Sequence, residues 1–388
     1  MYITQLRISE ILGFRGPRNV DLSFERPDGT HAGWTVLAGR NGSGKTSILR
    51  CIALAAIGPE ATRFVTPNPW ASSEGEIAIH ATSSRALLVA GYGPFRRLSS
   101  SISLSPATAG IPEEIHASRR VATLFNEEAT LVEGMAWLLN LHLQRLEKRP
   151  GASGLLNTVL SLLGDGLLPD GYRISRVDSR GLWVVNGDGH FPLGEMSAGY
   201  RSVTALVLNL VHSLHDVHRD LDVGRSKIAK KTILNPGVVL IDEIDAHLHI
   251  SWQKRIGGWL KAHFPNIQFI VTTHSPYACQ AADPGGLIRL AGPGEERSPE
   301  VVGQDLYQRI IYGSGDDAAL SELFGLDSPY SPAADELRHE LIALEEAVFA
   351  GTATKRQTAR YHELAGILSS SSTARVDEVA ARLSGGGK

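Results

Sequence analysis

Residues 34–56 contain the stretch that decides the fold. Trp34-Thr35-Val36-Leu37-Ala38 is followed directly by Gly39-Arg40-Asn41-Gly42-Ser43-Gly44-Lys45-Thr46, and then by apolar residues at helical spacing: Ile48, Leu49, Ile52, Ala53 and Ala56. The octapeptide matches the phosphate-loop pattern G-x-x-x-x-G-K-[ST] at every fixed position. It stands between a predicted strand and a predicted helix, and this order predicts a nucleotide-binding α/β fold.

The residue types of this loop explain how it would hold a nucleotide. Its glycines let backbone N–H groups turn inward around the β-phosphate, and the helix adds its positive end. Lys45 is predicted to reach the β and γ oxygens, and the hydroxyl of Thr46 to bind Mg²⁺. We therefore predict that ATP and Mg²⁺ bind at Gly39, Arg40, Asn41, Gly42, Ser43, Gly44, Lys45, Thr46 and Ser47.

A second carboxylate for the metal is found in Val238-Val239-Leu240-Ile241-Asp242-Glu243. The four apolar residues predict a buried strand, which would bring Asp242 to the sheet edge beside the phosphate loop, as a second metal ligand. The adjacent Glu243 is placed to orient the attacking water as a general base. The sequence thus predicts hydrolysis as well as binding.

Other segments predict the surroundings of this site. Alternating apolar residues around Leu6 and Leu22 predict a hairpin or a pair of edge strands, and 269–273 predicts a central parallel strand. Leucine-rich helices fill the lobe, about 115–170, and a hairpin is expected over 172–185. We predict an ATPase head over 1–328 and a C-terminal extension over 329–388, with helices at 334–348 and 355–368, a serine linker at 369–372, a last short helix and a flexible end.

Three further motifs carry a family resemblance. Met196-Ser197-Ala198-Gly199-Tyr200, before a predicted helix, resembles the signature loop of ABC-type ATPases of the RecF-like and SMC-like group. Ile244-Asp245-Ala246-His247-Leu248-His249 resembles that group's D-loop, and Thr272-Thr273-His274-Ser275-Pro276 its switch-histidine strand. The motifs cover roughly 1–290 in the family's order. The detailed sequence around these motifs resembles that of the AAA_21-type ATPases of bacterial anti-phage systems such as Septu and certain retrons.

The resemblance implies a fold and a mechanism. The fold would be a P-loop NTPase of ABC-ATPase type, with a mixed central sheet, an N-terminal antiparallel β subdomain, an inserted helical lobe and the C-terminal helical extension. Two subunits would pack head to tail around ATP, with Ser197 and Gly199 facing the γ-phosphate of the partner's nucleotide. Asp245 would belong to the nucleotide site, and His274 would contact the γ-phosphate or the water.

One departure concerns the glutamine that this family carries after the strand that enters its helical lobe. Gln144 is the only glutamine between Lys45 and Ser197, and it lies in the leucine-rich helices. The segment 91–97 stands in the usual place, so either Tyr92 or an arginine senses nucleotide there, or the segment is a structural turn. Two further points stay open. Arg15 either contacts nucleotide or is a plain surface residue. His247 and His249 either form a metal pair or serve the packing of the D-loop.

Composition bounds the possible partners. With 388 residues and a net charge of -3, a surface that is cationic throughout is excluded, although a local basic patch is not. The two cysteines, Cys51 and Cys279, lack metal-ligand spacing and fit a reducing cytoplasm. No apolar run is long enough to span a bilayer, and no charged leader precedes one, so we expect a cytoplasmic protein without a membrane partner.

Two function classes remain. The first is an ATPase that forms a homodimer or higher oligomer and controls a separate effector, a nuclease, in anti-phage defence. The second is a RecF-like repair ATPase that clamps DNA. We find no nuclease motif in the chain itself.

Two charged segments bear on the choice between these classes. The basic stretch 219–231 suits either phosphate contacts or a solvated, disordered connector. The alternating charges after Ala334 suit a protein partner better than nucleic acid.

Overall fold

The computed structural model describes residues 2–65, 75–82, 88–97, 112–326, 328 and 330–368. The chain divides into two units, Met1–Gly325 and Leu326–Lys388. The first unit holds all of the motifs described above. The predicted serine linker, last short helix and flexible end lie outside the described residues.

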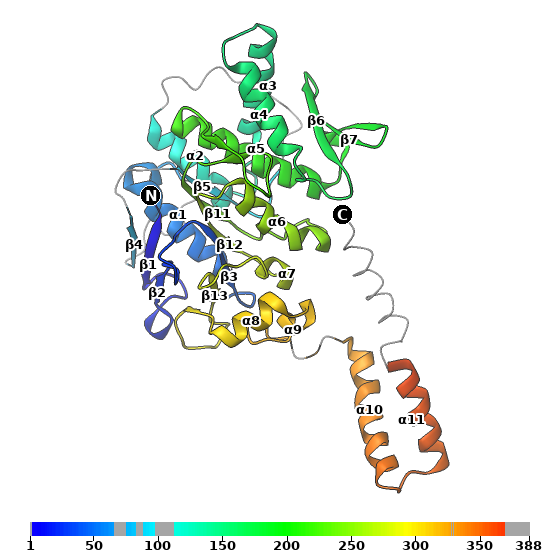
Figure 1. The fold of residues 1–388 in the computed structure, drawn as a ribbon. Coiled ribbons are helices and arrows are strands. Elements are labelled where there is room, and N and C mark those ends of the chain that lie inside the picture. Colours follow the sequence, from blue (N-terminus) through cyan, green and yellow to red (C-terminus); the bar gives the residue numbers. More distant parts are fainter. Residues whose placement is uncertain are drawn as a thin grey trace. The chain divides into compact units, whose positions relative to one another are not determined.

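A six-stranded sheet runs through the first unit in the order β14-β13-β3-β12-β11-β5 (Figure 1). All neighbouring strands are parallel except β13 and β14, which are antiparallel, so the predicted mixed sheet is confirmed. The two apolar segments predicted as central strands lie inside the sheet as β11 and β12. The strands are β3 (Gly33–Ala38), β5 (Leu88–Tyr92), β11 (Gly237–Ile241), β12 (Ile267–Thr272), β13 (Leu287–Arg289) and β14 (Glu300–Val301).

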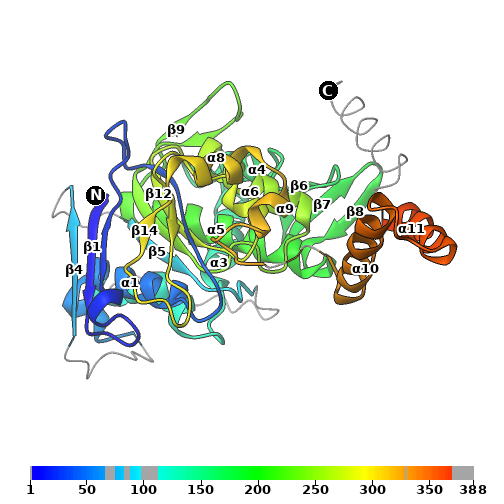
Figure 2. The same ribbon diagram turned by 90° about the horizontal axis from the view of Figure 1, so that it is seen from below.

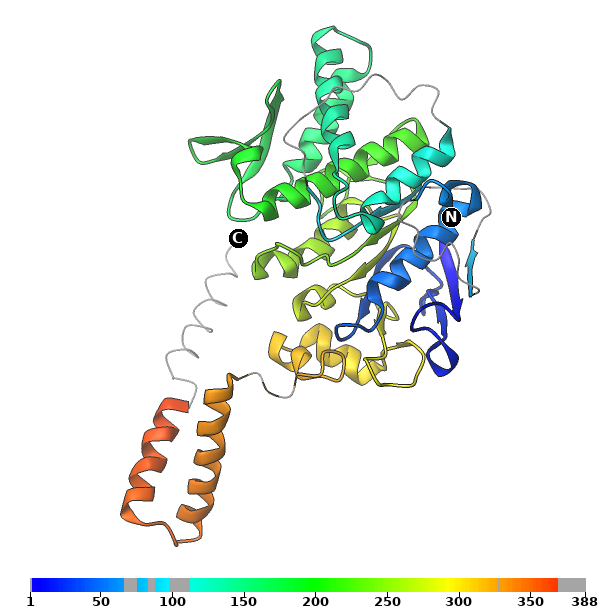
Figure 3. The same ribbon diagram turned by 180° about the vertical axis from the view of Figure 1, so that it is seen from behind.

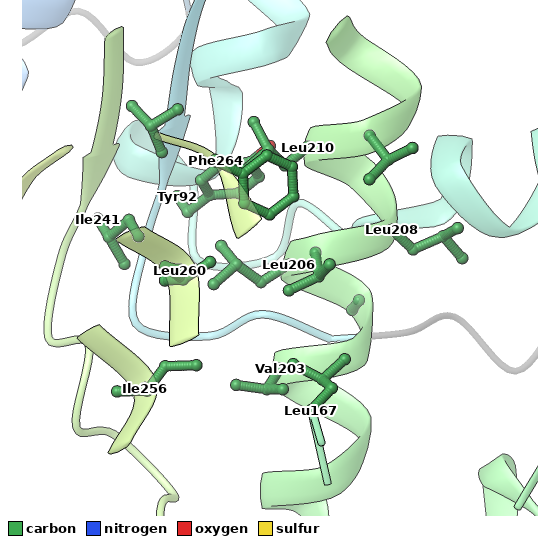
Figure 4. Close-up of a cluster of buried hydrophobic side chains, with 14 of the residues drawn as sticks. Tyr92, Leu167, Val203, Leu206, Leu208, Leu210, Ile241, Ile256, Leu260 and Phe264 are labelled. Carbon is green, nitrogen blue, oxygen red and sulfur yellow. The ribbon is translucent and has the colours of Figure 1, made fainter. Parts of the chain in front are cut away.

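The two faces of this sheet bury separate hydrophobic cores, because successive side chains of a strand point to opposite faces. Val239 and Ile241 of β11 enter one core, and Val238 and Leu240 enter the other. The first core includes α5 (Ala198–His218) and α6 (Ile250–His263), and Figure 4 shows Tyr92 of β5 among the side chains of these helices. The second core lies under α1 (Lys45–Thr62).

A second, antiparallel sheet precedes the phosphate loop and continues after α1. Its strand order is β2 (Val20–Ser23), β1 (Ile3–Ser9) and β4 (Glu76–Ala81), and it lies beside α1 (Figure 2). β1 is therefore the middle strand of three, and not an edge strand, because β4 pairs with its free side. Ile3, Leu6 and Ile8 are fully or almost fully buried as a result.

The helical lobe is formed by α3 (Val132–Leu146) and α4 (Ala152–Leu163), which pack on α5 and rise away from the central sheet (Figure 3). α2 (Glu113–Phe125) falls mostly within the range predicted for the lobe, but it packs on α1 and β5. There, Arg50 of α1 donates a 2.6 Å hydrogen bond from Nε to the carbonyl of Leu124. The remaining helices of this unit are α7 (Pro276–Cys279), α8 (Gln304–Tyr312) and α9 (Gly315–Ala319), with 3-10 turns at Gly16–Arg18 and Leu193–Glu195.

Two ribbons complete the first unit. The predicted hairpin is present as β6 (Arg173–Asp178) and β7 (Gly181–Asn186), and β8 (Gly189–Pro192) adds a third strand. The basic stretch 219–231 is not the disordered connector that was one reading of it. β9 (Val223–Gly224) and β10 (Thr232–Ile233) pair across it, and Ala229 between them is buried.

The second unit is a helical hairpin of α10 (Pro332–Phe349) and α11 (Lys355–Leu368). Arg360 of α11 binds Glu340 of α10 through two hydrogen bonds of 2.9 and 3.0 Å. Burial is slight, since α10 buries no residue and α11 buries only Leu364.

Candidate functional site

The phosphate loop connects the end of β3 to the start of α1. Gly44 immediately precedes the helix with φ at 91°, a left-handed conformation that favours glycine. A Cβ there would also lie 2.5 Å from Cζ of Phe14, whose buried ring packs beneath the loop. Arg40, Asn41 and Gly42 are exposed, whereas Gly39 and Ser43 are buried. The loop therefore presents its middle to solvent while its two ends are fixed by packing.

Lys45 lies at the first position of α1 and is almost fully buried. Its Nζ donates hydrogen bonds to the carbonyls of Gly39, at 2.8 Å, and of Arg40, at 3.1 Å. Burial lowers the pKa of this amine, and the charges of the nearby carboxylates partly oppose that change: Asp242, Glu243 and Asp245. The lysine is thus held within the loop, close to three acidic groups.

Ser43 carries the clearest unmet polar group of the loop. Its Oγ is buried, and no atom of the described residues accepts from it or donates to it. A buried hydroxyl without a partner is costly unless a ligand satisfies it. The residues therefore fit an anionic phosphate, because a donor, an ammonium group and the start of a helix converge on one loop.

Asp242 follows β11 and is almost fully buried. Its Oδ2 accepts a 2.8 Å hydrogen bond from Oγ1 of Thr46, the second residue of α1. Its Oδ1 accepts a 2.5 Å hydrogen bond from Oγ1 of Thr272, at the end of β12. The structure therefore brings together the hydroxyl and the carboxylate that were predicted to share Mg²⁺, and oxygen ligands of this kind suit that ion.

Glu243 stands next in the chain, half-buried, with φ at 45°. Its N–H donates a 2.8 Å hydrogen bond to Oγ1 of Thr272, the hydroxyl that also binds Asp242. One threonine thus fixes the positions of both acidic residues. Sequence reasoning gave Thr272 no such function, although the parallel pairing of β11 with β12 follows from two apolar strands that each end in polar residues.

Asp245 and His274 lie at the same edge of the sheet. Oδ1 of Asp245 accepts hydrogen bonds from Oγ1 of Thr273 and, at 3.3 Å, from the backbone N–H of His274. The His274 side chain is exposed. The carboxylate of Asp245 therefore holds the end of β12 in place and leaves the imidazole accessible.

The signature-like loop contacts a different part of this region. Ser197 immediately precedes α5, and Gly199 lies in its first turn. A Cβ at Gly199 would lie 2.5 Å from the carbonyl oxygen of His247, so only glycine permits this close approach. None of the described hydrogen bonds joins Ser197 or Gly199 to the phosphate loop of the same chain.

The segment that replaces the family's glutamine places an arginine in the site. Arg96 is 2% exposed and donates from Nη1 to the carbonyl of Asp242, at 3.1 Å, and from Nη2 to that of Glu243, at 3.0 Å. Longer contacts of 3.5 Å reach the carbonyls of Ile244 and Ala246. Burial lowers the Arg96 pKa to about 10, against the opposing charges of Asp245, Asp242 and Glu243. Arg96 therefore fixes the turn that carries both acidic residues.

Three other candidates lie away from this cluster or serve its packing. Tyr92 is buried and its hydroxyl donates a 3.2 Å hydrogen bond to Oδ1 of Asn209. Arg15 is exposed. His249 uses Nδ1 to accept from the backbone N–H of Ser251 and so caps α6. No group of three metal-ligating side chains occurs among the described residues.

Two family models match the sequence over these motifs. AAA_21, described as "AAA domain, putative AbiEii toxin, Type IV TA system", matches residues 118–279, and AAA_23, described as "AAA domain", matches residues 5–84. The chain carries an AAA-type ATPase domain. The phosphate loop falls in the second match, and the signature-like loop, the Asp242-Glu243 pair and the switch strand fall in the first.

Curated relatives of this ATPase domain belong to two systems. Septu protein PtuA of Bacillus mycoides (strain KBAB4) is 28% identical over 321 residues, which are 76% of this chain and 41% of that protein. The Retron Ec83 probable ATPase of Escherichia coli is 36% identical over 117 residues, 28% of this chain and 18% of that protein. The chain is homologous to both, and it spans less than half the length of the curated relatives it matches.

Solved structures with a similar chain path include SMC heads. The Smc head bound to the C-winged helix domain of ScpA gives a TM-score of 0.43 at 18% identity and covers 78% of this chain and 97% of that one. The SMC head domain from Thermotoga maritima gives a TM-score of 0.39 at 16% identity, over 78% of this chain and 100% of that one. Among the described helices of this protein, none combines the length and the apolar character that a membrane span needs.

Proposed function

We propose that the chain hydrolyses ATP in a head-to-tail dimer and that this cycle controls a separate effector, a nuclease, in anti-phage defence. The observation that carries the hydrolysis is the arrangement of Thr46, Asp242 and Thr272, which joins the phosphate loop to the sheet edge through hydrogen bonds of 2.8 and 2.5 Å. The AAA-type ATPase domain and the relatives named as ATPases support it.

The proposed functions of the side chains follow from these positions. Lys45, released from the loop carbonyls, binds the β and γ phosphate oxygens, and the partnerless Ser43 hydroxyl is one of the groups that contact phosphate. Glu243 orients the water and takes up its proton. Thr46 and Asp242 would hold Mg²⁺, which supplies charge neutralisation of the phosphates when bound. His274 contacts the γ-phosphate or the water, and Asp245 positions His274 through the backbone N–H of that residue.

The head-to-tail dimer is supported by the resemblance of Met196-Ser197-Ala198-Gly199-Tyr200 to the signature loop of ABC-type ATPases. Among the described residues, no hydrogen bond joins Ser197 or Gly199 to Lys45 or Thr46. A second copy, related by a two-fold axis, would bring its Ser197 to the first chain's phosphate loop and receive the same contact in return. Two equivalent sites would then form together.

Control of an effector is supported by homology to the Septu and retron proteins. The α10–α11 hairpin, whose exposed side chains include Ile342, Phe349 and Ile367, suits contact with a protein partner. The free, buried Cys51 and Cys279 fit a reducing cytoplasm.

The test combines turnover with nucleotide trapping. Purified protein should release phosphate from ATP only with Mg²⁺, and Glu243→Gln should lower the rate by roughly 100-fold or more while ATP still binds and the dimer persists in light scattering. Equal turnover in Glu243→Gln would remove that residue from the mechanism. Tight, salt-sensitive and ATP-dependent binding of duplex DNA by the chain alone would favour a repair clamp over effector control.

A further inference from the structure

A pocket of about 350 Å³ opens on the helical lobe, outside the predicted ATP site. It lies between α3, the start of α4 and the C-terminal end of α5, and its size falls within the range of small-molecule sites. The residues that the argument uses are Trp137, Asn140, Gln144, Gly151, His215 and Asp220. None of them has a place in the proposed hydrolysis of ATP.

One wall of the pocket is aromatic. Trp137 of α3 lies against His215 of α5, with ring centroids 5.5 Å apart and planes inclined by 43°. Both rings line the pocket, while Leu141 and Leu155 supply apolar surface beside them. A wall of this kind binds flat ring systems by stacking, which is worth about 1–3 kcal/mol per base in nucleic-acid-binding proteins.

The neighbouring amides give the pocket hydrogen-bonding groups. Nε2 of Gln144 donates a 3.0 Å hydrogen bond to Oδ1 of Asn140, one helical turn earlier. This bond orients the two exposed amides toward each other and leaves the Gln144 carbonyl as an acceptor and the Asn140 amino group as a donor. An adjacent donor and acceptor match the edge of a nucleobase. Gln144 is the only glutamine between Lys45 and Ser197, and ATP hydrolysis gives it no function.

The far end of the pocket lies at the start of α4. α4 begins after Gly151, whose φ is 80°, and no side chain caps its first turn. Lys148 and Arg149 lie in the connection that leads into it, and Arg149 pairs with Glu147 at 3.1 Å. Neither of these cations lines the pocket, so this end carries no defined position for a phosphate. Asp220, on the α5 side, repels phosphate but can accept from a ribose hydroxyl or a base amino group.

We propose that this pocket binds the base of a nucleotide, with the ring against Trp137 and the edge at the amides of Asn140 and Gln144. The aromatic wall and the amide pair provide one group for the face and one for the edge of such a base. α5 extends from the signature-like loop to this pocket, so the ligand would contact the helix that begins at Ser197. That last step rests on the proposed function, whereas the binding itself does not.

The binding test uses nucleoside 5′-monophosphates, which lack the β and γ phosphates that the phosphate loop holds. We would titrate each of the four common nucleoside monophosphates into the full chain, as wild type and as Lys45→Ala, and follow binding by calorimetry. At least one of the four should bind at one site in both proteins. Gln144→Ala and Asn140→Ala should each weaken binding by about tenfold, as expected for one lost hydrogen bond to a base. Both residues are exposed, so folding should be preserved.

Controls and contrary outcomes separate this site from the ATP site. Gln308→Ala, which removes an exposed amide from α8, should leave the affinity unchanged. Trp137→Phe should weaken binding less than Trp137→Ala. A second arm uses a single-stranded oligonucleotide, and preference for it would identify the source of the base as nucleic acid. Absence of binding to every probe, or binding that Lys45→Ala abolishes and Gln144→Ala does not change, would overturn the proposal.

Discussion

Thr46 donates a 2.8 Å hydrogen bond to Asp242, although the two residues are 196 positions apart. The bond joins the first turn of α1 to the end of β11, and it places a hydroxyl and a carboxylate oxygen together at one edge of the sheet. The phosphate loop and the acidic pair can therefore act on the same nucleotide.

The hydroxyl of Thr46 should be necessary for hydrolysis. Thr46→Val keeps the shape of the side chain but removes the donor to Asp242 and the predicted metal ligand, so we expect Mg²⁺-dependent phosphate release to fall by roughly 100-fold or more. Thr46→Ser retains the hydroxyl and should keep most of the rate. Phosphate release over a range of Mg²⁺ concentrations checks both, and equal activity in Thr46→Val would argue against this site.

The buried guanidinium of Arg96 should stabilise the turn of residues 242–246. Arg96→Met would leave the carbonyls of Asp242 and Glu243 without their donors, and we expect a loss of about 3 kcal/mol in the free energy of unfolding. Arg97→Met is the matched control, since Arg97 is exposed and its loss should cost less than about 0.5 kcal/mol. Urea denaturation of the three proteins measures the difference, and equal midpoints would contradict it.

Gly199 should not tolerate a methyl group. In Gly199→Ala the new Cβ would meet the His247 carbonyl at 2.5 Å, so the signature-like loop or the D-loop must move. We expect a destabilisation of about 1–3 kcal/mol, typical of overpacking. Gly194→Ala serves as the control, because a Cβ there meets nothing within 4 Å. If thermal unfolding shows no difference between the two variants, the close approach is not present in solution.

Acid should weaken the packing between the helical lobe and α5. His212 packs on Trp137, its Nδ1 is buried without a partner, and burial lowers its pKa to about 4 from 6.5. Asp216 opposes that change, and further cationic groups add to it: His215, His116 and Arg120. Because the unfolded chain takes up this proton first, stability is complete above pH 6.5 and declines as the pH falls towards 4.

The decline attributable to His212 should be about 3 kcal/mol, the free energy that corresponds to this difference in pKa. His212→Phe keeps a ring against Trp137 but cannot take up a proton. Its free energy of unfolding should therefore fall less than that of the wild type between pH 6.5 and pH 4. Parallel curves for the two proteins would show that His212 does not titrate in this way.

Local patterns were sufficient to predict the phosphate loop, β11 and β12, because each is a short apolar strand that ends in residues of special chemistry. The double use of Thr272 depends on the register between two strands 30 residues apart, which no local pattern contains. For the segment 91–97, the sequence left open Tyr92, an arginine or a structural turn. It could not select Arg96, because the partners of Arg96 are backbone carbonyls, which carry no sequence signal. The packing of Phe14 against Gly44 was not predicted either, because this contact forms only when the N-terminal sheet packs beside α1.

The central claim, that each site is shared between two chains, can be tested by mixing two inactive variants. Lys45→Ala disables the phosphate loop of one chain, and Ser197→Arg disables the signature-like loop of the other. In a mixed two-fold dimer, one site combines the intact halves of both chains, so equal amounts should restore about a quarter of the wild-type phosphate release. If mixed dimers form and the mixture stays as inactive as each variant alone, the head-to-tail arrangement is wrong.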